Sequence, residues 1–333
     1  MVIKFQYLKS IFPGVVLALI FCLFSQGINN LLAIEIFGTE KSPISTVLIA
    51  ILLGILMGNA FTPRPGMMIG LDFTQQYILK LGIIFLGIRL SFADFIKFGS
   101  VAIPLVIFCI LGVLILIKLL IKKVSISSKM SYLIAIGTSV CGATAIVATA
   151  PVINAKKTEV AYAIANITLF GVIAMLFYPY FAEWYFDNNA LEAGLFLGTS
   201  IHETSQVAAA GLIYDQQFNN PETLDVATVT KLIRNTFLVI LIPLFAFLYN
   251  RGEFKEQKYS ILSIFPYFVL GFIGMIILRN FGDQLFSVES NNFYAWSRFI
   301  EYLKILATVF LTMAMAAVGI SINLSELKSM GYK

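Results

Sequence analysis

The sequence predicts an all-α polytopic membrane protein with about ten transmembrane helices, two of them broken or re-entrant. Of the 333 residues, 59% are hydrophobic and only 12% are charged, which is more apolar surface than a single soluble core can bury. The apolar residues gather in successive runs, and two of these runs are interrupted by glycine, hydroxyl and ionisable residues. Together these observations favour a single transmembrane transporter domain over residues 1–333.

The first apolar run, residues 11–32, follows two lysines and has the start of a secretory signal. No small-residue cleavage site closes it and further apolar runs follow, so we interpret it as the first transmembrane helix. The later runs cover residues 45–60, 77–90, 101–120, 131–153, 159–181, 191–214, 227–249, 261–278 and 300–322. Residues 45–60 and 77–90 are shorter than the roughly 20 residues that a straight span needs, which favours half-helices or tilted, protein-buried helices.

The positive charges predict the orientation of these spans. Cytoplasmic loops are rich in lysine and arginine, and with the N-terminus in the cytoplasm most loop cations fall on that side. These cations are Arg64, Lys118, Lys122, Lys123, Lys129, Arg251, Lys255, Lys258, Lys328 and Lys333. Lys156 and Lys157 would lie outside, which disagrees with this rule. The disagreement is smaller if the segments near Gly137 and Gly198 are interrupted and do not cross the membrane as simple helices. The net charge of +5 therefore indicates orientation, and nucleic acid is not an expected partner.

Residues 198–211 read Gly-Thr-Ser-Ile-His-Glu-Thr-Ser-Gln-Val-Ala-Ala-Ala-Gly and place ionisable groups inside an apolar run. On a helix, Thr199, His202, Glu203 and Gln206 share an arc of roughly 100°. A charge at the bilayer centre costs about 2.5–3.5 kcal/mol and needs a partner. The only histidine of the chain, His202, titrates near neutral pH, so with Glu203 it is the candidate for proton or ion coupling. A structural hydrogen bond between the two side chains is the alternative.

A similar Gly-Thr-Ser run opens residues 137–144. Glycine lets a helix break, and the exposed N–H groups with nearby hydroxyls favour an anionic ligand, although small residues also suit helix packing. The residues expected to bind the ligand are Gly137, Thr138, Ser139, Cys141, Gly142, Thr144, Gly198, Thr199, Ser200, Ser205 and Gln206. Lys231 and Arg234, three apart on one helix face, can neutralise a bound anion, pair with Glu203 or extend to the interface.

Catalytic and metal motifs are missing from the sequence. Residues 202–206 approach the zinc-protease pattern, but Gln206 replaces its second histidine, so we expect no zinc or other metal. There is no Gly-x-Ser-x-Gly elbow or phosphate-binding glycine loop, and we expect neither enzymatic activity nor a cofactor. The three cysteines, Cys22, Cys109 and Cys141, lie in apolar runs and do not form a disulfide framework.

Several short motifs, taken in order, resemble the YeiH-type family of proposed sulfate exporters. They are Cys141-Gly142-Ala143-Thr144-Ala145-Ile146, Ala150-Pro151-Val152-Ile153, Ala174-Met175, Tyr178-Pro179, Ser200-Ile201-His202-Glu203, Gln206-Val207-Ala208-Ala209-Ala210-Gly211, Lys231-Leu232, Arg234, Met313-Ala314-Met315-Ala316-Ala317 and Gly319. The resemblance implies a secondary transporter of the inner membrane, distantly similar to sodium–proton antiporters and bile-acid symporters. It also implies a last hydrophobic span beyond Gly331, so either this member lacks that helix or the sequence is cut short.

Residues 87–95 and 319–327 are similar to each other and follow spans of opposite predicted orientation, which is consistent with an inverted repeat. The two Gly-Thr-Ser runs do not fit the same duplication, so the repeat stays open. We expect a secondary transporter of a small inorganic or organic anion, with sulfate export as the first candidate and a proton or sodium as coupling ion. A cation–proton antiporter, a membrane enzyme and a non-transporting scaffold are the alternatives, and a homodimer is left open.

Overall fold

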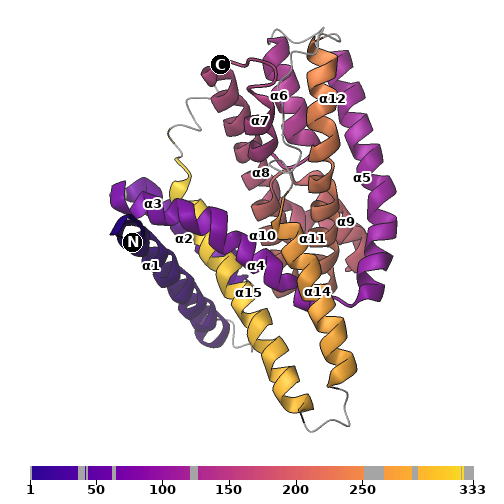
Figure 1. Cartoon of the computed structure of the whole chain (residues 1–333). Helices are drawn as coiled ribbons and strands as arrows, with labels where there is room; N and C mark the ends of the chain where they lie inside the picture. Colours follow the sequence, from indigo (N-terminus) through magenta and orange to yellow (C-terminus); the bar gives the residue numbers. More distant parts are fainter. Residues whose placement is uncertain are drawn as a thin grey trace. The chain divides into compact units, whose positions relative to one another are not determined.

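The computed structural model of the chain describes residues 2–36, 42, 44–61, 65–120, 127–250, 266–286, 292–323 and 325, and the elements in these ranges are helices (Figure 1). The chain divides into two compact units. Unit 1 comprises Met1–Asp94, Ala208–Asp225 and Phe268–Lys333, and unit 2 comprises Phe95–Val207 and Val226–Tyr267. The prediction that residues 1–333 act as a single transporter domain stays a prediction.

Unit 1 is built from helices of both ends of the chain. Its elements are α1 (Val2–Leu31), η1 (Leu32–Ile36), α2 (Thr46–Ala60), α3 (Pro65–Phe73), η2 (Thr74–Ile78), α4 (Leu79–Leu86), η3 (Gly87–Arg89), α14 (Phe268–Leu285) and α15 (Phe293–Ser321). η1 and η2 are short π-helical turns, and η3 is a 3₁₀ turn.

Unit 2 contains the middle of the chain. Its elements are α5 (Phe92–Leu120), which enters unit 2 at Phe95, α6 (Ser128–Ser139), α7 (Ala143–Thr149), α8 (Lys157–Phe186), α9 (Ala190–Ser200) and α12 (Leu238–Asn250). α10 (Thr204–Phe218) begins in unit 2 and ends in unit 1, and α11 (Pro221–Thr236) begins in unit 1 and ends in unit 2.

Seven helical stretches in the described part of the chain are long and apolar enough to cross a membrane. They are Ser10–Ile36, Pro65–Arg89, Phe92–Ile117, Lys157–Phe186, Pro221–Leu244, Phe268–Leu285 and Phe293–Ser321. The other three predicted spans fall on the 15-residue helix α2 and on the pairs α6–α7 and α9–α10, each interrupted by non-helical residues. The count of ten spans therefore stays a prediction.

The expectation of a short span at residues 77–90 is wrong, because Pro65–Arg89 forms one helical stretch of 25 residues. Asp72 and Gln75 lower the hydropathy of its first half, so the search for apolar runs did not include it. The Gln75 amide is satisfied inside the protein, because Nε2 donates to the Ala317 carbonyl oxygen at 3.1 Å. A polar side chain with such a partner is tolerated in a membrane helix.

Close glycine contacts join pairs of helices inside unit 1. α2 and α15 lie side by side (Figure 1), and a Cβ added at Gly54 would lie 2.6 Å from the Ala316 carbonyl oxygen and 3.0 Å from the Gly319 Cα. α1 and α3 meet in the same way at Gly14 and Gly70. Backbone contact of this kind is the small-residue packing that membrane helices use.

A core of apolar side chains holds α6, α7 and α8 together in unit 2. Leu133 and Ile136 of α6, Ile146 of α7 and Ile167 of α8 are buried in one cluster. A Cβ added at Gly137 of α6 would lie 2.3 Å from Ile167 Cδ1 and 2.9 Å from Ile146 Cδ1, so a side chain here would have to displace both isoleucines. The sequence of small and branched residues in this region therefore fixes α7 and α8 against the end of α6.

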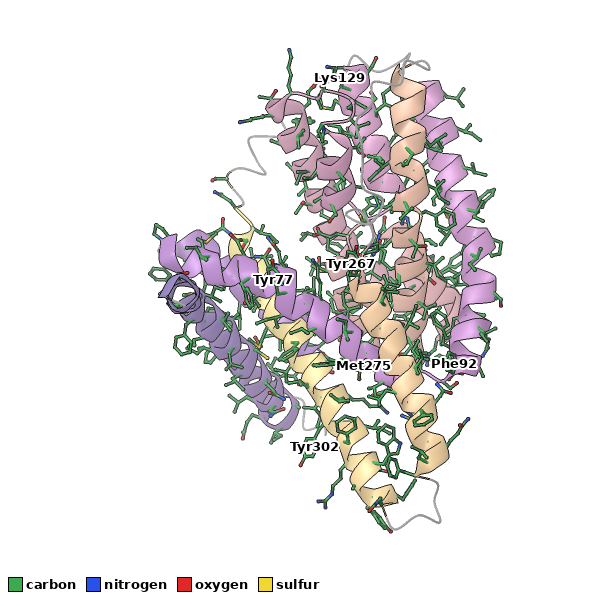
Figure 2. The ribbon with its side chains drawn as sticks, in the orientation of Figure 1. Tyr77, Phe92, Lys129, Tyr267, Met275 and Tyr302 are labelled. Carbon is green, nitrogen blue, oxygen red and sulfur yellow. The ribbon has the colours of Figure 1, made fainter. Side chains whose placement is uncertain are left out.

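Large apolar and aromatic side chains are exposed on the outer surfaces of the helices. Phe92 is 43% exposed and Tyr302 is 68% exposed (Figure 2), and Phe108 of α5 is 73% exposed. Patches of this kind are rare on soluble monomers and are expected where helices face lipid. The chain is a multi-pass membrane protein, and the burial pattern agrees with the composition.

Several residues on which the orientation and the repeat were predicted lie outside the described residues. These are Arg64, Lys122, Lys123, Arg251, Lys255, Lys258, Lys328 and Lys333, together with Leu324, Glu326 and Leu327 of the second copy of the repeat. The cytoplasmic N-terminus and the inverted repeat stay predictions.

Candidate functional site

The first interruption separates α6 from α7. α6 ends at Ser139, residues 140–142 are non-helical, and α7 begins at Ala143. Gly142 has φ +66° and ψ −123°, a backbone conformation that L side chains rarely adopt. Its N–H donates to the Gly137 carbonyl oxygen at 3.0 Å, which closes the turn. The glycine predicted to break this segment is therefore the residue at which the backbone turns.

The second interruption separates α9 from α10. α9 ends at Ser200, and α10 begins at Thr204. The backbone of Ile201 is extended, with φ −89° and ψ 132°, and its side chain is buried. His202 and Glu203 occupy the rest of the gap, and the Glu203 carbonyl oxygen accepts from Val207 N at 3.0 Å at the start of α10.

The two interruptions contact each other inside unit 2. A Cβ placed on Gly142 would lie 3.7 Å from the Glu203 Cβ and 3.7 Å from the His202 carbonyl oxygen. The Gly-Thr-Ser runs, about 60 residues apart in the sequence, therefore end at a common point. Helix ends carry backbone groups without intrahelical partners, so this point needs other groups to satisfy them.

Lys231 of α11 satisfies carbonyl groups of both interruptions. Its side chain is completely buried, and Nζ donates to the carbonyl oxygens of Val140 at 2.8 Å, Ile201 at 3.0 Å and His202. An ammonium group has three donors, and all three are used here. Lys231 is therefore a bridge between the interruptions, with no N–H left for a direct ligand contact.

Arg234, one turn further along α11, makes the matching contacts at the ends of α6 and α9. Nε donates to the Ser139 carbonyl oxygen at 2.8 Å, Nη1 to the Thr199 carbonyl oxygen at 2.5 Å, and Nη2 to the Thr138 carbonyl oxygen. The C-terminal end of a helix carries roughly half a negative charge, so a buried guanidinium stabilises both ends. Arg234 has further N–H groups beyond these three contacts.

Several buried polar atoms around this point have no hydrogen-bond partner among the described residues. They are Ser139 Oγ, His202 Nδ1, Gln206 Oε1, Thr230 Oγ1 and Asn235 Oδ1. Burying a polar atom without a partner costs free energy, so native proteins rarely accumulate such atoms. A cluster of them beside two cations is expected where a polar ligand or water binds.

Comparison with known proteins gives the family. Residues 13–333 match the sequence family described as Conserved hypothetical protein 698. The chain belongs to the YeiH-type UPF0324 family of membrane proteins. The resemblance on which this family was expected is confirmed.

Three relatives illustrate how far the similarity to UPF0324 proteins extends. A UPF0324 membrane protein of Streptococcus agalactiae serotype V is 34% identical over 326 residues, covering 98% of this chain and 91% of the relative. One from Fusobacterium nucleatum is 33% identical over 305 residues, covering 90% and 86%, and one from Pasteurella multocida is 34% identical over 311 residues, covering 91% and 86%. No solved structure matches the chain.

The hydroxyls that the sequence assigned to this UPF0324 site have different surroundings. Thr199 Oγ1 donates to the Leu195 carbonyl oxygen at 2.7 Å, and Ser200 Oγ donates to the Phe196 carbonyl oxygen at 2.6 Å. Both hydroxyls therefore donate their protons to carbonyl groups within α9. The Ser139 hydroxyl is buried and bonds none of the described residues, whereas Thr144 lies exposed on α7.

Other predicted residues of the UPF0324 site have packing roles. Gly198 of α9 lies against Thr230 and Ala227 of α11, with 2.7 Å between its added Cβ and the Thr230 Cβ. Cys141 is buried in the first interruption and is a free thiol. Gly137 and Gly198 thus lie in close contacts between helices, and their role in ligand binding stays a prediction.

The polar residues of α10 complete the surroundings. Gln206 Nε2 donates to the Thr168 carbonyl oxygen of α8 at 3.3 Å, and the Glu203 side chain hydrogen-bonds Ser205. His202 Nδ1 has no partner among the described residues, so a hydrogen bond between His202 and Glu203, the alternative to proton coupling, does not form through that nitrogen. In the described residues no group of three or more His, Cys, Asp or Glu side chains is arranged to hold a metal.

Two α11 residues beside the site were not predicted. Thr230 and Asn235 flank the two cations, and Asn235 Nδ2 donates to Thr204 Oγ1 of α10 at 2.9 Å. Each has one polar atom without a partner. Both residues are polar and lie directly beside Lys231 and Arg234 in one predicted membrane helix, and this position could have identified them from the sequence.

Proposed function

We propose that this protein is a secondary active transporter of a small anion, with sulfate as the first candidate, working by alternating access at the point where the two helix interruptions meet. One observation carries the proposal: two buried cations of α11 reach both interruptions, and buried polar atoms without partners surround them. In this proposal α6–α7 and α9–α10 are broken membrane helices, an arrangement that transporters use for substrate sites at the bilayer midplane.

The sum of charges at this point favours an anion. Lys231 and Arg234 contribute two positive charges, and the C-terminal ends of α6 and α9 offset about one of them. The N-terminal end of α10 adds about half a positive charge, and an ionised Glu203 removes one. The sum is positive, and it rises by one when Glu203 binds a proton. Binding of an anion then favours protonation of Glu203, which is the basis for coupling transport to protons.

Neutral donors would complete the substrate contacts. The hydroxyls of Ser139 and Thr230 are buried and have no partner within the described ranges, and Arg234 has N–H groups beyond its three carbonyl contacts. Sulfate accepts hydrogen bonds through all of its oxygens, so hydroxyl and guanidinium donors suit it. For this transport role we place the protein in the cell inner membrane with its N-terminus in the cytoplasm, which the distribution of loop cations supports.

Transport in proteoliposomes tests the proposal directly. The purified full chain is reconstituted, and uptake of radiolabelled sulfate is measured under an imposed pH gradient and, separately, under a sodium gradient. Sulfate uptake above that of empty vesicles, lost in Thr230→Val, is the expected result. Uptake no greater than in empty vesicles under both gradients would reject sulfate. Sodium–proton exchange without any anion flux would instead favour a cation–proton antiporter.

A further inference from the structure

In unit 2 the segment that contains α6 and α7 begins and ends at the same place. Lys129, in the first turn of α6 (Figure 2), donates through Nζ at 2.6 Å to the carbonyl oxygen of Asn154, which follows the end of α7. α6 has 12 residues and α7 has 7, so two helices that continued in one direction would separate these points by roughly 25 Å or more. α7 therefore turns back along α6.

A second contact joins the start of α6 to the start of α8. Ser127 caps α6 by accepting from Met130 N at 3.2 Å, and its Oγ donates to Glu159 Oε1 at 2.5 Å. Glu159 Oε2 accepts from Lys156 N at 2.8 Å at the N-terminal end of α8. The partial positive charges at the N-terminal ends of both helices favour a carboxylate in this position. α6 and α8 therefore begin at the same level, with the turned-back segment between them.

The charges along α8 indicate which side of the membrane this level faces. α8 has 30 residues and is about 45 Å long, which is enough to cross a bilayer. Lys156 and Lys157 lie at its start, and the sequence contains no further lysine or arginine before Lys231. Its other end carries Glu183 and Asp187. Because cations collect on the cytoplasmic side, the start of α8 belongs in the cytoplasm.

We propose that α6 and α7 form a re-entrant hairpin that enters and leaves the membrane on the cytoplasmic side, with residues 140–142 at its tip. Lys156 and Lys157, which a crossing segment would place outside, then lie in the cytoplasm together with Lys129. The tip backbone is satisfied by buried side chains, because the carbonyl oxygens of Val140 and Ser139 accept from Lys231 and Arg234. Non-helical backbone at membrane depth requires such burial in protein.

The hairpin also assigns one half of the transport site to one side of the membrane, a role that rests on the proposed function. Its tip carries the first interruption, while both of its ends are attached in the cytoplasm. Movement of this half is therefore expected to alter access from the cytoplasm, because no part of the hairpin reaches the opposite surface.

Labelling of single cysteines in oriented membrane vesicles tests the proposal on the full chain. Ser128→Cys, Lys157→Cys and Glu192→Cys change exposed positions at the starts of α6, α8 and α9. We expect a membrane-impermeant maleimide to label the first two only in inside-out vesicles and Glu192→Cys only in right-side-out vesicles. The unmodified chain measures background labelling of its own cysteines, of which Cys22 and Cys141 are buried.

Labelling of Ser128→Cys and Lys157→Cys from opposite sides would overturn the hairpin, and labelling of both from outside would overturn its orientation. A second measurement needs no substitution: an impermeant amine reagent is applied to the unmodified chain, and modification of Lys129 and Lys157 is read by mass spectrometry. Both should react from the cytoplasmic side, and reaction from different sides would overturn the proposal. Neither measurement involves transport, so failed sulfate uptake with the expected labelling would reject the transport function and leave the hairpin in place.

Discussion

The carbonyl oxygen of Val140 accepts a hydrogen bond of 2.8 Å from Nζ of Lys231. This contact joins the first helix interruption to α11, and the same Nζ donates to Ile201 and His202 in the second interruption. One side chain thus holds together two segments that are distant in the sequence. The predictions below test what this cation and its neighbours contribute to stability and to transport.

Removal of the charge at Lys231 should destabilise the protein. In Lys231→Met the three carbonyl groups lose their donor inside the protein, and each unsatisfied group costs about 1–3 kcal/mol. We expect a loss of about 3 kcal/mol or more in the free energy of unfolding, seen as a lower melting temperature in detergent. Lys157→Met, at an exposed position at the start of α8, should melt like the unmodified protein. Equal melting of both variants would contradict the bridging role.

Replacement of the guanidinium by an ammonium should not rescue Arg234. In Arg234→Lys the charge is kept, but a single Nζ replaces the planar fork whose Nε, Nη1 and Nη2 reach three carbonyl oxygens. We expect a destabilisation of about 1–3 kcal/mol and a loss of most sulfate uptake. Melting temperature and proteoliposome uptake measure the two effects. A variant with unchanged uptake would show that charge alone suffices at this position.

Alanine at two glycines should have opposite effects. Gly142→Ala forces a side chain into a conformation with φ +66° and into contact with Ile167, which should cost about 1–2 kcal/mol. Gly112→Ala, in the middle of α5 where no atom lies within 4 Å of the added Cβ, should be neutral or stabilise by up to about 1 kcal/mol. Melting temperatures compare the two directly. Equal effects would contradict the role of Gly142 as the turning point.

Loss of hydroxyls without partners should affect transport more than stability. Ser139→Ala and Thr230→Val remove buried hydroxyls that have no hydrogen-bond partner in the described part of the chain, so no hydrogen bond seen there is lost. We expect unchanged or slightly higher melting temperatures and a marked loss of sulfate uptake. Thr312→Val is the control, because Thr312 Oγ1 donates to the Thr308 carbonyl oxygen at 2.8 Å and lies in α15. It should lower stability by about 1 kcal/mol and keep uptake.

Glu203→Gln should separate proton coupling from anion binding. Glutamine keeps the shape of the protonated side chain but cannot release a proton, so uptake driven by a pH gradient should be lost. Exchange of internal for external sulfate needs no net proton movement and should persist. Glu192→Gln, at an exposed position in the first turn of α9, should leave both activities unchanged. Loss of exchange together with driven uptake would instead make Glu203 part of the anion site.

The sequence predicts those features that depend on local composition. Each membrane span has to form its own backbone hydrogen bonds, so apolar runs indicate helices, and the Gly-Thr-Ser runs mark the gaps between α6 and α7 and between α9 and α10. The first half of Pro65–Arg89 was missed because Asp72 and Gln75 make it polar, and the Gln75 amide bonds the Ala317 carbonyl oxygen of another helix. Local composition cannot report such distant partners.

The sequence predicted most residues of the candidate site, but it did not predict what each of them contacts. Lys231 bonds Val140, which lies 91 residues away, and Ile201, which lies 30 residues away. No local pattern encodes these pairs, so the cations were assigned to an anion, to Glu203 or to the interface, and their bonds to helix-end carbonyls were not foreseen. Thr230 and Asn235 were missed for a related reason, because Thr and Asn in a membrane helix are as common at packing surfaces as at sites.

The contact of Gly54 with Gly319 has a consequence for motion in unit 1. Two helices that touch through their backbones leave no layer of side chains that could slide or change rotamer between them. We therefore expect α2 and α15 to move together, and we expect bending within this unit where a helix is locally rewound, such as the π-helical turn Thr74–Ile78.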